Sequence, residues 1–295
     1  MVGASTVFIA LAAVFWGLSG GIGGILMADG WDPFVVSFHR GAIGLLFVVV
    51  WLLLRPRGSG LADRRTWSWS ALAGLGLAGN FAFYFLSIAQ GSVAVAATLM
   101  YSAPVFVYLA SFALRLERPT ALKGIAIVVV MLGIVLLTQI HDVDARGVTP
   151  LGVAAGLLAG LCYATFIFGF KYATPHGSPQ AILTIAFAVV AIVLVWPGDG
   201  DQTVAALGST RWPLFVVLGV FGAGLSFVLY VIGLRRTAPA VASILAMVEP
   251  VTASLFGVVV LGEVLVRSQL LGMGLILVTV TALSVRAGSG RSTSD

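Results

Sequence analysis

The sequence predicts an all-α polytopic membrane protein in which ten transmembrane helices form two inverted five-helix repeats. Three observations lead to this prediction. Residues of the set AVILMFWYC make up 60% of the chain, and charged residues make up 9%. The apolar residues gather into ten runs of membrane-spanning length. A segment of the first half also recurs, with clear sequence similarity, in the second half.

The composition excludes several classes of protein. The chain has 295 residues but only 16 Lys and Arg and 11 Asp and Glu, whereas a soluble domain is roughly 25% charged. A disordered chain would be far more polar. The single cysteine, Cys162, cannot form an internal disulfide. The sequence pI of 9.8 does not indicate nucleic-acid binding, because the basic residues lie between apolar segments rather than on one solvated face.

The first half of the chain contains five apolar runs, separated by turn residues and charges. The first run is too long for the core of a signal peptide, and no Lys or Arg precedes it, so we interpret it as an uncleaved span. Each run is long enough to cross about 30 Å of hydrocarbon, which takes ~20 helical residues. The predicted spans are 4–27, 33–54, 67–88, 91–114 and 120–138.

The second half contains five more runs of the same kind, at 150–173, 178–196, 211–234, 238–260 and 267–286. All the connections are short, so the function must lie within the bilayer. We therefore predict a first repeat over 1–146, a second and inverted repeat over 147–287, and a disordered cytoplasmic tail over 288–295.

The loop charges predict the orientation, because cytoplasmic loops carry an excess of Lys and Arg. One set of loops holds twelve of these residues and the opposite set holds three. The twelve are Arg55, Arg57, Arg64, Arg65, Arg115, Arg118, Lys123, Lys171, Arg235, Arg236, Arg286 and Arg291; the three are Arg146, Arg211 and Arg267. Both termini are therefore expected on the cytoplasmic side.

An internal repeat relates the fourth and ninth spans at an offset of 146 residues. Seven of the sixteen positions in 94–109 are identical to their counterparts, and the register also places Pro104 on Pro250 and Glu117 on Glu263. An odd number of spans per half inverts the second half relative to the first. Inverted repeats are typical of secondary transporters, whose substrate sites lie near the midplane between the halves. A duplication without any role in transport is the alternative.

Four segments carry a resemblance to a known family. They are FWGLSG in the first span, FHRGAIGLL in the second, SVAVAATLMYSAPVFVYLASFALRLERP across the fourth and APAVASILAMVEPVTASLFGVVVLGEVL across the ninth. Over essentially its whole length the chain resembles the EamA branch of the drug/metabolite transporter superfamily. Within that branch it is most similar to the bacterial YddG-like exporters of aromatic and other hydrophobic amino acids. The resemblance implies ten helices around a central cavity, alternating access, and a location in the bacterial cytoplasmic membrane.

Two charged residues are expected near the middle of the bilayer. Glu249 lies about eleven residues, or ~16 Å, from the cytoplasmic end of the ninth span, and Arg40 lies at a similar depth in the second. Ionisable groups at that depth usually face a wet cavity and mark a transport pathway. The alternative is a buried ion pair, or a protonated Glu249, that only fixes helix packing. The first repeat carries Ala103 where the second carries Glu249, so any role of this carboxylate is one-sided.

Polar and aromatic residues recur at helical spacing on several spans, which is typical of a cavity lining. Interhelical hydrogen bonds are the alternative explanation for each of them. The residues predicted to bind substrate are Trp16, Arg40, Asn80, Tyr84, Thr98, Tyr101, Tyr163, Ser243, Met247 and Glu249.

Proline and glycine predict local features of the helices. Pro104 and Pro250 each remove an intrahelical hydrogen bond, so they are expected to kink their spans, either as paired hinges or as features of static packing. The doubled GxxxG at 152–160 predicts close helix packing. The run GLSGGIGG at 17–24 weakens the first span and would permit bending.

Other functional classes are less well supported. The pattern GLSGG resembles the GxSG of rhomboid intramembrane proteases, with Ser19 as nucleophile and His39 as base. The alternative to a role as base is that His39 contributes only to helix packing. The sequence has no metal-ligand spacing and no phosphate-binding loop. A channel or a structural membrane component is the third class, and saturation of the flux separates a carrier from a channel.

We expect a secondary exporter that acts as a monomer in the lipid bilayer, without ATP, metal or cofactor. A hydrophobic amino acid needs a donor for its carboxylate, a partner for its ammonium group and an apolar wall. Arg40 or an interrupted-helix N-terminus serves the first need, and Glu249 or an aromatic face serves the second. A lipophilic cation needs only the last two, so drug efflux is the alternative. The sequence does not decide whether export is coupled to protons.

Overall fold

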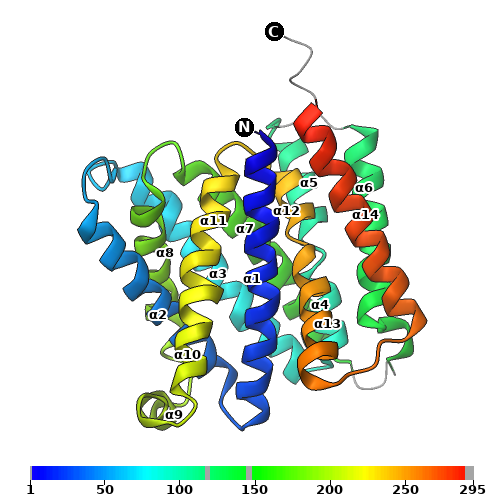
Figure 1. Cartoon of the computed structure of the whole chain (residues 1–295), viewed down its shortest axis with the longest axis horizontal. Coiled ribbons are helices and arrows are strands. Elements are labelled where there is room, and N and C mark those ends of the chain that lie inside the picture. The colour runs from blue at the N-terminus through cyan, green and yellow to red at the C-terminus, as the bar shows by residue number, and fades with distance from the viewer. Residues whose placement is uncertain (1, 117–119, 144–147, 290–295) are drawn as a thin grey trace.

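The computed structural model describes residues 2–116, 120–143 and 148–289, and throughout these ranges the chain is a bundle of helices without a β-strand (Figure 1). Seven helices are continuous: α1 (Val2–Ala28), α2 (Pro33–Leu54), α3 (Arg64–Ala89), α6 (Ala121–Thr138), α7 (Pro150–Ala173), α8 (Pro179–Leu194) and α14 (Arg267–Ser289).

Three further spans are divided into shorter pieces. They are α4 (Val93–Met100) with α5 (Ala103–Ala113); α10 (Trp212–Gly219), the π-helical η4 (Val220–Leu225) and α11 (Ser226–Leu234); and α12 (Pro239–Leu245) with α13 (Val248–Leu261). The connections contain α9 (Gly200–Ala205) and the 3₁₀ turns η1 (Ile140–Asp142) and η3 (Ala206–Gly208).

Within the described ranges, nine helical segments are long and apolar enough to cross a membrane. The prediction of an all-helical, multi-pass membrane protein is therefore confirmed. The predicted span over 178–196 is the apolar helix α8, which has 16 residues. That length falls short of the ~20 residues of a straight crossing, so a tenth span requires that α8 also crosses the bilayer.

The helix boundaries follow from capping residues. Asp32 accepts hydrogen bonds from the backbone of Phe34 and Val35 at the start of α2, where Pro33 occupies the first helical position. Such side chains satisfy backbone N–H groups that have no partner within the helix. Equivalent caps begin α3, α4, α6, α7 and α8, at Asp63, Ser92, Thr120, Thr149 and Ser178.

The C-terminal helix α14 continues to Ser289, so the first two residues of the tail predicted as disordered are helical. The rest of that predicted tail, 290–295, lies outside the described residues. Glu117, used in the repeat register, and Arg118 and Arg146, counted among the loop charges, also lie outside them.

Glycines permit the closest helix contacts, and α3 packs against α7 through several of them. A Cβ on Gly76 would lie 2.7 Å from the backbone nitrogen of Phe166, and one on Gly169 would lie 2.7 Å from that of Ala73. The doubled GxxxG of α7 packs on α4, because a Cβ on Gly156 would lie 2.7 Å from Leu99. The packing predicted for this motif is confirmed.

The fourth and ninth spans are interrupted at matching places. Helix α4 gives way to α5 at Tyr101, and α12 gives way to α13 at Met247, positions related by the predicted offset. Pro104 and Pro250 follow these breaks within three residues, and each lacks the N–H that an uninterrupted helix needs. The predicted irregularity is therefore present in both spans, and α13 begins inside the bundle with Glu249 in its first turn.

Candidate functional site

A cavity of about 240 Å³ lies in the middle of the bundle. It is smaller than the roughly 300–1,000 Å³ pockets that hold drug-sized ligands, so it suits a small metabolite. Helices α1, α2, α3, α7, α10 and α13 and the end of α4 line it. Its wall includes the side chains of Trp16, Ser19, Ser37, Arg40, Asn80, Phe81, Tyr84, Phe85, Met100, Tyr101, Tyr163 and Glu249.

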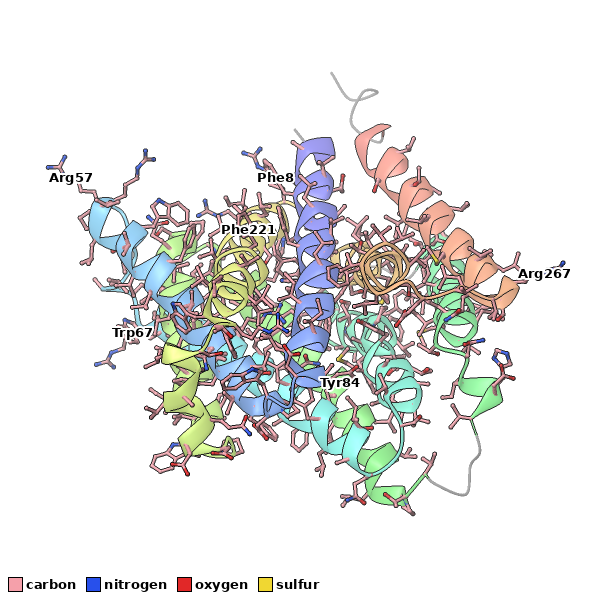
Figure 2. The ribbon with its side chains drawn as sticks, turned by 60° about the horizontal axis from the view of Figure 1, so that its bottom comes forward. Phe8, Arg57, Trp67, Tyr84, Phe221 and Arg267 are labelled. Atoms are coloured by element: carbon pink, nitrogen blue, oxygen red, sulfur yellow. The ribbon has the colours of Figure 1, made fainter. Side chains whose placement is uncertain are left out.

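The cavity extends toward one end of the bundle. Its wall reaches Met27 near the end of α1 and Val36 near the start of α2. In Figure 2, Tyr84 lies close to this end of α1. Toward the opposite end, Trp16 packs against the fully buried ring of Tyr230, at 4.9 Å between ring centroids, and against Phe166. This aromatic layer closes the bundle on the side of the N-terminus.

The Glu249 carboxylate is held by a tyrosine hydroxyl group. Tyr163 on α7 donates a hydrogen bond to Oε2 of Glu249 at 3.2 Å, and Tyr101 lines the same cavity. A negative charge in the first turn of a helix is stabilised by the helix dipole. Gly17 lets α1 approach closely here, because a Cβ at that position would lie 2.5 Å from the carbonyl oxygen of Glu249.

The Arg40 guanidinium is held from two sides. Its Nε and Nη2 both donate to the carbonyl oxygen of Gly222, at 3.1 and 2.7 Å. Its central carbon lies 5.3 Å from the ring centroid of Phe81, in a cation–π contact. Arg40 and Glu249 line the same cavity. Although the structure describes both side chains, they form no direct salt bridge, unlike Arg211 and Asp29 at the end of the bundle.

The remaining polar groups of the wall differ in whether they have hydrogen-bond partners. Asn80 donates through Nδ2 to the carbonyl oxygen of Ala159 at 3.0 Å, which ties α3 to α7. The indole nitrogen of Trp16 is buried and has no hydrogen-bond partner among the described residues. A buried donor without a partner costs free energy unless a ligand or water accepts from it.

Seven of the ten residues predicted to bind substrate line this cavity: Trp16, Arg40, Asn80, Tyr84, Tyr101, Tyr163 and Glu249. The other three do not. Thr98 bonds to Thr138 on α6 at 2.6 Å. Ser243 is fully buried and donates to the carbonyl of Ala240, and Met247 is fully buried in the apolar core.

Several wall residues were not predicted from the sequence, notably Ser37, Phe81, Phe85 and Met100. Phe81 and Phe85 each follow a predicted residue of α3 by one position, so a wider stripe on that helix would have included them. Ser37 precedes Arg40 by three residues and therefore lies on the same helix face.

The protease arrangement proposed for Ser19 and His39 is absent. Ser19 donates to the carbonyl of Trp16 at 2.8 Å. His39 bonds through Nδ1 to the carbonyl of Val35 at 2.9 Å and packs against the rings of Trp212 and Phe215. A nucleophile needs its base within hydrogen-bonding distance, and these two side chains have other partners. Among the described residues no group of His, Cys, Asp and Glu side chains is arranged to hold a metal.

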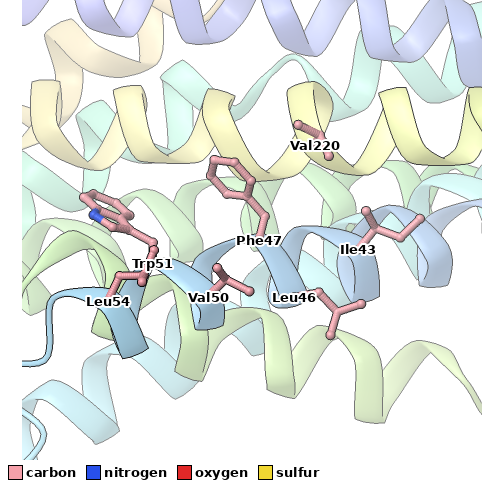
Figure 3. Close-up of a pocket in the computed structure, with 7 residues that line it drawn as sticks. All are labelled: Ile43, Leu46, Phe47, Val50, Trp51, Leu54 and Val220. Atoms are coloured by element: carbon pink, nitrogen blue, oxygen red, sulfur yellow. The ribbon is translucent and has the colours of Figure 1, made fainter.

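A larger groove, of about 500 Å³, lies on the outside of the bundle between α2 and η4 (Figure 3). Its wall is apolar, and Leu46, Val50 and Leu54 are 64%, 56% and 76% exposed. Exposed apolar side chains on a membrane-spanning helix face the lipid. The groove offers no partner for a charged group, so it is not the candidate site.

Comparison with known proteins gives consistent matches. The sequence profile of the EamA-like transporter family matches residues 4–139 and again residues 150–285. The transporter YwfM of Bacillus subtilis is 26% identical over 95% of this chain and 93% of its own length. A transporter of Archaeoglobus fulgidus is 31% identical over 92% of this chain and 93% of its own length.

The threonine/homoserine exporter RhtA of Escherichia coli is 28% identical over 69% of this chain and 66% of its own length. One protein of known crystal structure superposes with a TM-score of 0.75, covering 96% of this chain and 97% of that chain at 19% identity. That likeness shows a shared fold.

Proposed function

This chain belongs to the EamA-like transporter family, and we propose that it exports amino acids, above all those with hydrophobic or aromatic side chains. It is a multi-pass membrane transporter and not an enzyme. The observation that carries the proposal is a pair of opposite charges, Arg40 and Glu249, that face one cavity without neutralising each other directly.

A zwitterion fits between these charges. The carboxylate of an amino acid pairs with the guanidinium of Arg40, and its ammonium group pairs with Glu249 and the hydroxyl groups around it. Each charge of the protein then gains a partner when the substrate enters. This arrangement favours zwitterions over anions or cations of similar size, because a singly charged ligand leaves one protein charge without a partner.

The residues of the cavity wall support a preference for amino acids with hydrophobic or aromatic side chains. Phe81, Tyr84, Phe85 and Met100 present aromatic rings and a thioether to the space beside the two charges, and such surfaces bind apolar groups. The similarity to RhtA, named as an exporter of threonine and homoserine, supports the amino-acid class. The ring surface favours larger apolar side chains than those two substrates carry.

A second candidate function is the efflux of lipophilic cations. Glu249 with the rings of Tyr101 and Tyr163 would suit an organic cation. This alternative leaves Arg40 without a ligand, and its charge would repel a cation. We therefore rank it below amino-acid export.

The transport cycle we propose is alternating access between two inverted repeats over 1–146 and 147–287, with Pro104 and Pro250 as hinges. With the basic loops and both termini in the cytoplasm of a bacterial cell, the cavity described above faces outward. The protein would act as a monomer in the cytoplasmic membrane, since all the charged and aromatic groups of the proposed site come from one chain.

A flux assay in liposomes tests the proposal. Protein reconstituted in liposomes is supplied with L-phenylalanine, L-leucine, L-threonine and tetraphenylphosphonium, each radiolabelled. Saturable counterflow of the amino acids, with L-phenylalanine or L-leucine moved fastest, is the expected result. Saturable flux of tetraphenylphosphonium alone would favour cation efflux, and flux that rises linearly with concentration would indicate a channel.

A further inference from the structure

The π-helical segment η4 lies directly against the arginine of the cavity. In an α-helix the backbone N–H of Ser226 would bond to the carbonyl of Gly222. Here that N–H instead donates to the carbonyls of Phe221 and Ala223. π-helical turns make up well under 1% of residues in proteins, and they occur frequently at functional sites. The widened turn releases the Gly222 carbonyl from the backbone N–H of Ser226.

The released carbonyl becomes the centre of a small hydrogen-bond network. Its oxygen accepts from Nε of Arg40 at 3.1 Å, from Nη2 of Arg40 at 2.7 Å and from Oγ of Ser226 at 2.9 Å. Ser226 is fully buried, so bulk solvent does not compete for its hydroxyl. The oxygen therefore fixes one edge of the guanidinium.

The geometry of the guanidinium group determines which N–H donors of Arg40 remain for a ligand. A guanidinium carries five N–H donors in one plane. The Nε–H and one Nη2–H point to the same side, and both are used by Gly222. The other Nη2–H and one Nη1–H form a second, parallel pair, which matches the two oxygens of a carboxylate. No residue that the structure describes hydrogen-bonds to Nη1 of Arg40.

One further contact restricts the plane of the guanidinium, and another restricts the position of the π turn. Phe81 covers one face of the guanidinium at 5.3 Å. On α1, Ser19 lies so close to Gly222 that a Cβ at position 222 would overlap the Cβ of Ser19. Only glycine lets the π turn approach Ser19 and present its carbonyl to Arg40 at the same time.

We infer that Gly222 and Ser226 are positioning residues for substrate recognition: the π turn holds the inner edge of Arg40 so that its outer pair of N–H groups binds the carboxylate of the substrate. The inference rests on the proposed function and deepens it. Recognition through two parallel bonds distinguishes a carboxylate from a carboxamide, which has only one oxygen. The π turn thus makes the transporter selective for amino acids over their amides and over the corresponding amines.

The test compares L-threonine with L-threoninamide, and L-phenylalanine with L-phenylalaninamide, as competitors in the liposome assay. Wild-type protein should bind the acids at least about ten-fold more tightly than the amides. One hydrogen bond to a charged group contributes a factor of about ten or more in affinity. Equal affinities in wild-type protein would count against the zwitterion site itself. The wild-type comparison therefore tests the proposed function, whereas the variants at position 226 test the positioning role.

Ser226→Asp places a carboxylate beside the Gly222 oxygen, where it competes for the guanidinium. We expect the acid-to-amide ratio to fall about ten-fold or more. Ser226→Asn is the matched neutral variant, and it should lower the ratio by less than about three-fold. Equal ratios in the two variants, with wild-type selectivity intact, would overturn the positioning role.

Arg40→Lys supplies a second readout that does not depend on the folding of the position-226 variants. Lysine keeps the positive charge but cannot bond the Gly222 oxygen through two nitrogens while offering a parallel pair to the substrate. The acid-to-amide ratio should then fall at least about five-fold. A ratio unchanged from wild type would overturn the inference.

Discussion

The Arg40 guanidinium and the Glu249 carboxylate face the same cavity, yet each is bound to other groups and they form no direct salt bridge. Arg40 is turned toward the Gly222 carbonyl, and Glu249 toward Tyr163. A direct pair would neutralise both charges and leave little for a ligand. The separation keeps a positive and a negative site available within one small space, which is the basis of the predictions on transport.

Glu249→Gln should lower transport of L-phenylalanine much more than it lowers stability. The amide keeps the size of the side chain and can still accept from Tyr163, but it offers no charge to an ammonium group. A charged hydrogen bond contributes about 1.5–3 kcal/mol, so we expect KM to rise roughly 10-fold or more. Counterflow in liposomes measures KM, and thermal unfolding in detergent measures stability.

Glu263→Gln is the matched control, because it makes the same chemical change at an exposed residue next to Gly257, outside the cavity. Its KM should stay close to that of wild type. Equal flux in the two variants would remove Glu249 from the binding site. Unfolding of the Glu249 variant alone would assign it a packing role.

Tyr163→Phe should weaken transport, whereas Tyr230→Phe should not. Tyr163 loses its bond to the Glu249 carboxylate, and we expect KM to rise several-fold and the free energy of unfolding to fall by about 1–2 kcal/mol. The buried hydroxyl of Tyr230 has no partner among the described residues, so its removal should be neutral or stabilising. Parallel KM and melting measurements on both variants check this. A larger stability loss for Tyr230→Phe than for Tyr163→Phe would contradict this prediction.

Some residues of the site can be predicted from the sequence and others cannot. A charge within an apolar helix is a more reliable indication than helix periodicity. A charge in an apolar helix is costly wherever it lies, so Arg40 and Glu249 were identifiable without coordinates. Helix periodicity selected Asn80 and Tyr84, which line the cavity. It also selected Thr98, which does not line the cavity, because a hydroxyl bonded to Thr138 on α6 and one that faces a cavity produce the same pattern along the helix.

The π turn could not be predicted from the sequence. The residues of η4, VFGAGL, read as an ordinary apolar stretch within a span, and the extra residue in the turn leaves no pattern there. Its cause lies in tertiary contacts, since Arg40 on α2 and Ser19 on α1 meet Gly222 from residues far away in the chain. The breaks before Pro104 and Pro250, in contrast, follow from the missing N–H of proline.

Gly76→Ala should destabilise the bundle, because the added Cβ would lie 2.7 Å from the backbone nitrogen of Phe166 and 2.9 Å from the carbonyl oxygen of Cys162. Backbone atoms of α7 cannot move aside without shifting the helix, so the cost should be roughly 1–3 kcal/mol. Gly274→Ala, with no atom within 4 Å of the new Cβ, should be neutral or stabilise by up to ~1 kcal/mol. Thermal unfolding in detergent compares the two, and equal melting temperatures would contradict the close α3–α7 contact.

Cysteine labelling tests the orientation. In a Cys162→Ala background, Arg57→Cys at the exposed α2–α3 connection should react with a membrane-impermeant maleimide only after the cells are opened (Figure 2). Asp201→Cys, at the opposite end in α9, should react in intact cells. The reverse pattern would place the basic loops outside and the cavity on the cytoplasmic side.

The last prediction concerns Pro104 and Pro250, which follow matching helix breaks in the two halves of the chain. Alanine at either position restores an N–H and lets the neighbouring helices join, which stiffens one span only. Because the halves are inverted, stiffening α4–α5 and stiffening α12–α13 should bias the outward-open and inward-open states in opposite directions. Spin labels on two exposed pairs, Val93 with Trp196 at one end and Leu114 with Leu54 at the other, report the state through their distance distributions. If each variant shows the distance distributions and the flux of wild type, the prolines are packing features and not hinges.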